Sequence, residues 1–333
     1  MFALDALLER LPDALVDDPA GKRLRLLGEQ LPDALSRRIG LEARLGIDPT
    51  VDLLLLAATP RELGILAGTD PHVQLGDALT ATAPWQGAAR LARRAQTLID
   101  TGSPLPPGIW LELDATATEL VPALFTAAAP DPGHPAAHTW DTVTTVGDIL
   151  REVAGADPPA ALMTQIARVV DSPLTVRQIG CFTGRPNAGV RLFCAHQVGT
   201  PLTRALTAAG WRGAADAVEH WAQIAYEFGD RVHIGLDLTA TGTLPTIGLE
   251  ITLADAAQPH QDPRWAKLLD LLLALDLGTD DKRDAVLALG RAYELRLPHL
   301  RRYRQGLHHL KISVSGAGEA SVKVYFGAYE VTE

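Results

Sequence analysis

The chain has 333 residues, of which 47% are hydrophobic and 21% charged, and its formal net charge is −10. An apolar content near one half is typical of a globular protein with a sizeable core. The acidic balance disfavours binding to DNA or to anionic membranes, since affinity for phosphates comes from clustered Lys and Arg. We therefore expect no nucleic-acid partner and no membrane partner.

The start of the chain and its two cysteines indicate a cytoplasmic protein. Residues 1–10 include acidic side chains and do not resemble a signal peptide. No apolar run reaches the roughly 18 residues of a membrane-spanning helix. Cys181 and Cys194 are too few for a disulfide framework, so both are expected to be reduced thiols.

The first third of the chain is predicted to be mainly helical. Leucines recur at helical spacing over residues 3–45, where the sequence LPDAL occurs at 11–15 and again at 31–35. An apolar run at 51–58 is the first predicted strand, and helices are expected at 60–67 and 86–100. We predict that residues 1–100 form a mainly helical part that is continuous with the rest of the fold.

Residues 101–333 are predicted to alternate hairpins with helices. We expect a strand at 109–116, helices at 144–170, 201–228 and 263–277, and hairpins at 177–196, 231–253 and 308–331. The predicted turns at 184–187, 241–243 and 315–318 all contain Gly, which favours tight reversals. Thr279, followed by two aspartates, is predicted to cap a helix, because its hydroxyl can accept from an orphan backbone N–H.

The predicted strands share one pattern, with an aliphatic face and a face that is charged or polar at mid-strand. In the last strand Val322 and Val324 alternate with Lys323 and Tyr325, and alternate side chains point to opposite faces. Successive hairpins predict an α+β fold with an antiparallel sheet of about eight to ten strands and helices on the aliphatic face. The sheet is either open to water on its polar face or closed into a barrel with a polar interior.

The polar face supplies the candidate site residues, which are Glu112, Asp114, Arg191, His233, Asp237, Glu250, Lys311, Lys323 and Tyr325. In an open sheet they form cross-strand charge pairs that stabilise by about 1 kcal/mol or less each. In a closed barrel they share one chamber. The Arg and the two Lys side chains would there neutralise a diphosphate leaving group, and Glu112, Asp114 or Glu250 would accept a proton.

No motif for nucleotide, metal or nucleophile chemistry is strong. The Gly-rich segment 180–189 is followed by a strand, whereas a phosphate loop needs a helix N-terminus. His134 and His138 lie in a Pro-rich loop without rigid support for three or four converging ligands. We therefore predict no metal site.

The succession of hairpins and helices and the segment KVYF at 323–326 resemble the ABBA aromatic prenyltransferases. Those enzymes repeat an αββα unit into an antiparallel barrel with the helices outside, and their strands often carry Lys-x-Tyr inward. The resemblance implies that Lys323 binds the diphosphate of an isoprenoid donor and that Tyr325 shields an allyl cation. Lys311 and Arg191 match by strand position alone, and the strands carry fewer Tyr and Trp than is typical of that shield.

A second resemblance is to uncharacterised bacterial proteins of ribosomal peptide natural-product pathways, through the segments RQIGCFTGRP, VRLFCA, TIGLEITL, LKISV and VKVYFG. The favoured hypothesis is a peptide natural-product tailoring enzyme, a prenyltransferase that acts on a peptide or small aromatic acceptor with an isoprenoid diphosphate donor. The alternative is a peptide-binding partner in a lanthipeptide-type modification complex, catalytic in another way or not at all. A third possibility is a non-catalytic binding module that holds a leader peptide by strand addition.

Overall fold

Helices and hairpins alternate five times in the part of the chain that the computed structural model describes, namely residues 2–35, 37–117, 119–184, 189–196, 199–254, 257–290, 292–296 and 300–331. The strands are β1 (Arg38–Arg44), β2 (Val51–Ala57), β3 (Ile109–Leu113), β4 (Pro122–Ala127), β5 (Leu174–Phe182), β6 (Val190–His196), β7 (Arg231–Thr239), β8 (Gly242–Thr252), β9 (Ala292–Arg296), β10 (Leu300–Val314) and β11 (Ala320–Val331).

Helices precede each pair of strands in the sequence. They are α1 (Phe2–Leu8), α2 (Asp18–Glu29), α3 (Pro60–Ala67), α4 (Asp77–Thr80), α5 (Ala83–Asp100), α6 (Thr142–Ala154), α7 (Ala160–Val170), α8 (Leu202–Ala208), α9 (Ala215–Phe228), α10 (Arg264–Ala274) and α11 (Asp280–Leu287), with short 3-10 helices at Asp33–Leu35 and Pro135–His138. None of the helices in the described ranges combines the length and the apolar character needed to cross a bilayer.

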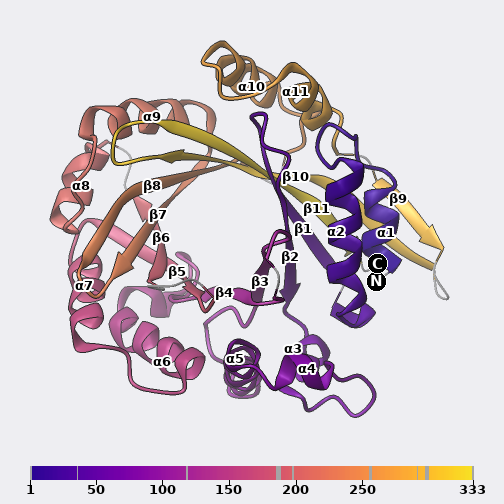
Figure 1. The fold of residues 1–333 in the computed structure, drawn as a ribbon. Coiled ribbons are helices and arrows are strands. Elements are labelled where there is room, and N and C mark those ends of the chain that lie inside the picture. Colours follow the sequence, from indigo (N-terminus) through magenta and orange to yellow (C-terminus); the bar gives the residue numbers. More distant parts are fainter. Residues whose placement is uncertain are drawn as a thin grey trace.

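The sheet closes into an antiparallel barrel of ten strands with the helices outside (Figure 1). Strands β1 to β8 follow one another around the ring, β10 pairs with β8, and β11 pairs with both β10 and β1. β9 is hydrogen-bonded to the part of β10 that extends beyond the ring. The closed alternative is therefore the observed one, and the predicted α+β class, with helices on the aliphatic face, is confirmed.

The aliphatic faces of the strands point outward and form the core beneath the helices. Side chains expected there are between 0% and 3% exposed, namely Leu236, Ile251, Leu310, Ile312, Val322 and Val324. Fully burying a Leu or Ile side chain stabilises a fold by roughly 1.5–3 kcal/mol. This repeated burial fixes the register, because a slip of one residue would turn every charged side chain into the core.

Several predicted elements differ from the structure. Residues 38–44 form β1 instead of a helix, and β4 was not predicted, although the ten strands of the barrel agree with the expected eight to ten. The helix predicted at 144–170 is two helices, since α6 ends at Gly155 in the left-handed conformation (φ 72°). The helix predicted at 201–228 is likewise interrupted near Gly210 (φ 87°). The predicted turn at 184–187 lies outside the described residues, apart from Gly184.

Helix α11 fixes the turn between β1 and β2. Thr279 caps this helix as predicted, because its hydroxyl accepts a hydrogen bond from the Lys282 backbone N–H. The Nζ of Lys282 donates to the carbonyls of Arg44, Gly46 and Asp48 at 2.6–2.8 Å. Three carbonyl acceptors satisfy this nearly buried ammonium group, so the end of β1 is held in one position.

Candidate functional site

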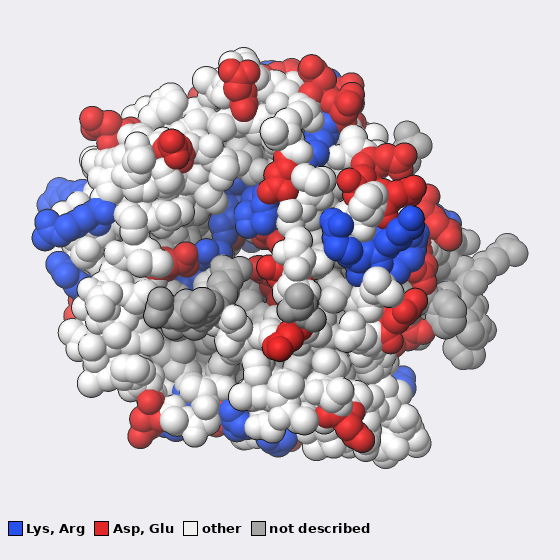
Figure 2. Space-filling model, viewed as in Figure 1, with Lys and Arg blue, Asp and Glu red and all other residues white. Residues whose placement is uncertain are grey.

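The polar faces of the strands enclose a chamber that solvent reaches. The side chains of Arg191, Lys323 and Glu250 lie on the inward face of the barrel but keep 20%, 26% and 14% of their surface exposed. Figure 2 shows the barrel hollowed at its centre, with Lys, Arg, Asp and Glu side chains on the wall. Of the two arrangements considered for the polar face, the shared chamber is the one that the structure contains.

Three cations lie side by side on one wall of the chamber. The register places Lys323 of β11 directly opposite Arg44 of β1 and Lys311 of β10. Like charges directly opposite each other destabilise a sheet unless anions compensate them. Here Glu42 bonds Arg44 at 2.7 Å and also bonds Lys323, and Glu250 bonds Lys311 at 3.1 Å. Asp52 also lies 3.5 Å from Arg44, so the wall sets three cations among three carboxylates.

Glu42 is the centre of this wall, although no candidate residue was predicted in β1. Its side chain is buried and accepts hydrogen bonds from Lys323, Tyr325 and Arg44. Burial alone would raise its pKa, but the charge and hydrogen bond of Lys323, with the Tyr325 hydroxyl, lower the pKa of Glu42 to about 2. Burial and the nearby Glu42 carboxylate raise the pKa of Tyr325 well above its ordinary value. The phenol is therefore a hydrogen-bond donor at neutral pH.

Glu112 is an acid that is half protonated near neutral pH. Burial, followed by the negative charge of Glu42, raises the pKa of Glu112 to about 7. The positive charges of Lys323, Arg191 and Lys311 lower the pKa of Glu112 in part, so burial and Glu42 outweigh them. A group with such a pKa can take up or release a proton at physiological pH.

Arg191 and Asp237 form a second charged wall across β6 and β7. Two parallel hydrogen bonds of 2.7 and 2.8 Å join the guanidinium to the carboxylate. Burial would lower the pKa of Arg191, but the hydrogen bond and charge of Asp237 raise it. The guanidinium carbon also lies 5.0 Å from the ring centre of Phe182. This geometry holds Arg191 as a fixed cation above an aromatic face.

An aromatic wall adjoins these charges and was not predicted. Phe125 makes edge-to-face contacts with Phe182 and Phe193, each with ring centres 5.8 Å apart, and Trp110 packs against this cluster. Gly180 lies opposite Phe125 in the register and makes room for its ring, because a Cβ at Gly180 would overlap it. Alternation in the sequence could have predicted this wall, since the aromatic rings occupy strand positions that alternate with buried aliphatic residues.

The remaining predicted residues lie at the edges of the chamber. His233 is opposite Glu250 in the register, and burial lowers its pKa despite the carboxylate charge. Asp114 follows the end of β3, is exposed, and accepts hydrogen bonds from Thr116 at 2.6 and 2.8 Å. Its charge contributes to the pKa of Asp52, which burial and Glu42 raise to about 6. The structure thus separates Asp114, at the rim, from the predicted acids inside.

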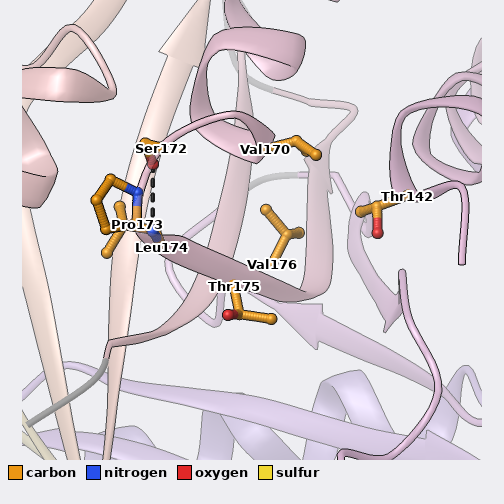
Figure 3. Close-up of a pocket in the computed structure, with 7 residues that line it drawn as sticks. All are labelled: Thr142, Val170, Ser172, Pro173, Leu174, Thr175 and Val176. Carbon is orange, nitrogen blue, oxygen red and sulfur yellow. Dashed lines mark hydrogen bonds between the residues drawn. The ribbon is translucent and has the colours of Figure 1, made fainter. Parts of the chain in front are cut away.

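A second hollow lies outside the chamber, where the ends of α6 and α7 meet the start of β5 (Figure 3). It has a volume of about 330 Å³ and is lined by Thr142, Val170, Ser172, Pro173, Leu174, Thr175 and Val176. None of these lining residues is ionisable. The Ser172 hydroxyl already donates to the Val169 carbonyl at 2.6 Å and accepts from the Leu174 N–H at 3.3 Å. The groups with acid–base chemistry are those of the barrel.

Comparison with known proteins bears on the fold. No family model matches the chain, and no curated protein matches it. Among solved structures, the crystal structure of AnaPT from Neosartorya fischeri resembles it with a TM-score of 0.50, over 87% of this chain and 77% of that one, at 14% identity. At this identity the likeness shows the fold alone. The chain therefore has a closed barrel of the αββα type, which is the architecture expected from its resemblance to the ABBA prenyltransferases.

Proposed function

We propose that this protein is a prenyltransferase that moves an isoprenoid group from its diphosphate to an aromatic or peptide acceptor. One observation carries the proposal. A chamber that solvent reaches holds a row of three cations, an aromatic wall and an acid with a pKa of about 7. These are the parts needed to accept a departing anion, to surround a carbocation and to remove a proton.

The cation wall is suited to the diphosphate. Without a ligand, Glu42, Asp52 and Glu250 pair with Arg44, Lys323 and Lys311. A diphosphate carries several negative charges and would bind the exposed side of this wall through charge-assisted hydrogen bonds. These bonds strengthen as the carbon–oxygen bond of the donor breaks, because negative charge then gathers on the leaving oxygen.

The other walls serve the carbocation and the acceptor. We place the allyl cation against the rings of Tyr325 and Trp110, because Arg191 and Lys311 already lie over Phe182 and Phe193. The acceptor carbon or heteroatom forms the new bond to the allyl carbon as the carbon–oxygen bond of the donor breaks. The acceptor then loses one proton to a base, for which Glu112 has the matching pKa. The diphosphate leaves with the electron pair of the broken bond, so the reaction needs no oxidant or reductant.

A transfer assay tests this function. The purified protein is incubated with dimethylallyl, geranyl or farnesyl diphosphate and with tryptophan or tryptophan-containing peptides, and mass spectrometry detects the gain of one prenyl unit. We expect Lys323→Ala to lower turnover roughly 10²–10³-fold, as loss of one stabilising donor does in other enzymes. Lys267→Ala, on the exposed side of α10, is the matched control. No product with any donor, together with no donor binding by calorimetry, would contradict the proposal.

The edge of the sheet favours a second candidate function, which is peptide binding without prenyl transfer. In the described sheet β9 is the last strand and is hydrogen-bonded to β10. An extended peptide can add to such an edge through main-chain hydrogen bonds. In that role the protein would be a partner in a lanthipeptide-type modification complex.

The two lysines of the chamber separate these candidates. If Lys323→Ala and Lys311→Ala abolish turnover but keep affinity for the peptide, prenyl transfer is supported. If the wild-type protein binds the peptide but no donor, and both variants keep that affinity because neither lysine lies on the β9 edge, the binding role is supported. Isothermal titration with the peptide and with each diphosphate measures both quantities.

A further inference from the structure

Strand β10 contains a β-bulge beside the chamber. Leu310 pairs with Val324 and His309 with Tyr325, but the next pair joins Leu307 to Phe326, so His308 is the extra residue. Leu307 and Leu310 are 2% and 0% exposed in the outer core, although strict alternation over three residues would place them on opposite faces. The bulge therefore lets β10 bury both leucines, while His309, which alternates with Leu310 in the regular ladder, faces the chamber.

Gln258 holds the bulge from the loop between β8 and α10. Its Oε1 accepts from the Leu307 N–H at 2.8 Å, and its Nε2 donates to the Leu307 carbonyl at 3.1 Å. The side chain is 9% exposed and occupies a space that two glycines leave open. A Cβ at Gly306 would overlap the Gln258 amide, and one at Gly290 would lie 2.9 Å from the Gln258 Cβ. The amide thus satisfies both backbone groups of Leu307 at the point where the ladder is disrupted.

The bulge determines the surroundings of Tyr325. The His309 ring is stacked on the Tyr325 ring, with centres 4.0 Å apart and planes 14° apart. His309 is fixed in turn by a 2.6 Å contact between its Nδ1 and that of His308. The Tyr325 hydroxyl donates to Glu42, which also bonds Lys323. A change at the bulge would therefore reach the cation wall through the Tyr325 ring.

We infer that Gln258 is a positioning residue of the chamber, because its hold on Leu307 fixes the bulge residue His308, which contacts the His309 ring where that ring stacks on Tyr325. It thereby sets the plane of the ring that donates to Glu42. An effect of the Tyr325 ring orientation on turnover rests on the proposed function. The effect of Gln258 on the positions of His309 and Tyr325 does not.

Nuclear magnetic resonance of protein labelled at histidine tests the inference without a substrate. In the wild-type protein the His309 ring protons are expected to be shifted upfield by the Tyr325 ring and to show cross-peaks to it, with His309→Gln used for assignment. In Gln258→Ala both the upfield shift and the cross-peaks are expected to be lost. Gln261→Ala is the matched control, because it removes the 2.9 Å hydrogen bond that Gln261 accepts from the Gln258 backbone N–H but neither of the two bonds between the Gln258 side chain and Leu307.

A second variant keeps the test decisive if Gln258→Ala does not fold. Gly306→Ala must displace the Gln258 amide while the hydrogen bonds within the loop remain, so the same loss of the His309 signature is expected. Unchanged His309 signals in a folded Gln258→Ala or Gly306→Ala protein would overturn the inference. A lack of prenyl transfer by the wild-type protein would count against the proposed function, and it would leave the spectroscopic result to decide the role of Gln258.

Discussion

Replacing Glu42 with Gln removes the negative charge that holds Lys323, Tyr325 and Arg44 on one wall of the chamber. The pKa of Glu42 is about 2 in the folded protein, compared with an ordinary value of 4.5. Each tenfold change in proton affinity corresponds to about 1.4 kcal/mol. The ionised Glu42 therefore stabilises the folded protein at pH 7 by roughly 3 kcal/mol, and we expect Glu42→Gln to lower the free energy of unfolding by about that amount.

The pH dependence of this loss has a defined sign. The folded pKa of Glu42 lies below the unfolded one, so its stabilisation is fully present above about pH 4.5 and disappears as the pH falls through about 2. Urea denaturation of the wild-type and variant proteins should give a difference of roughly 3 kcal/mol at pH 7 and about half of that at pH 3. Glu227→Gln, on the exposed side of α9, is the control. A penalty below about 0.5 kcal/mol at pH 7, or one that is equal at both pH values, would refute the assigned ion pairs.

Three further results are expected. Leu236→Ala should lower the free energy of unfolding, measured by urea denaturation, by roughly 2–5 kcal/mol. Leu244→Ala, at a position 42% exposed, should lower it far less. Equal losses would mean that the outer core is misplaced. The rate of prenyl transfer should rise with pH through about 7 as Glu112 loses its proton. Glu112→Gln should remove this rise, and an unchanged pH–rate profile in that variant would mean that another group is the base. Gly180→Ala should lower the free energy of unfolding by roughly 1–3 kcal/mol, and with it the melting temperature, because the new methyl group overlaps the Phe125 ring. An unchanged melting temperature would show that the ring moves freely.

Alternation along the strands was sufficient to predict which side chains face the chamber. It placed Arg191, Lys311 and Lys323 on the polar face and the neighbouring aliphatic residues outside, because a period of two residues needs no tertiary information. The same pattern exists in β1, where Ile39 and Leu41 alternate with Gly40 and Glu42. It was missed because the preceding leucines have helical spacing, which extends the predicted helices over residues 3–45.

Alternation could not predict the partners of these side chains. Lys323 meets Glu42 from a distance of 281 residues in the sequence, and a register shift of two residues would keep every face but change every pair. The bulge at His308 also could not be predicted from alternation, because the residue that bonds beside it, Gln258, lies in a different loop. The barrel's register and this loop contact are tertiary properties, so they became visible with the structure.

The pairing of β11 with β1 also has consequences for the order of folding. Hairpins such as β5–β6 and β7–β8 are local and can form early, but the contact between Lys323 and Glu42 closes a loop of 281 residues, which carries a large entropic cost. A chain that ends before Ala320 would lack Lys323 and Tyr325, which bond Glu42, and it would expose unpaired edges on β1 and β10. During synthesis, therefore, incomplete chains lack one wall of the chamber and are the species most exposed to aggregation.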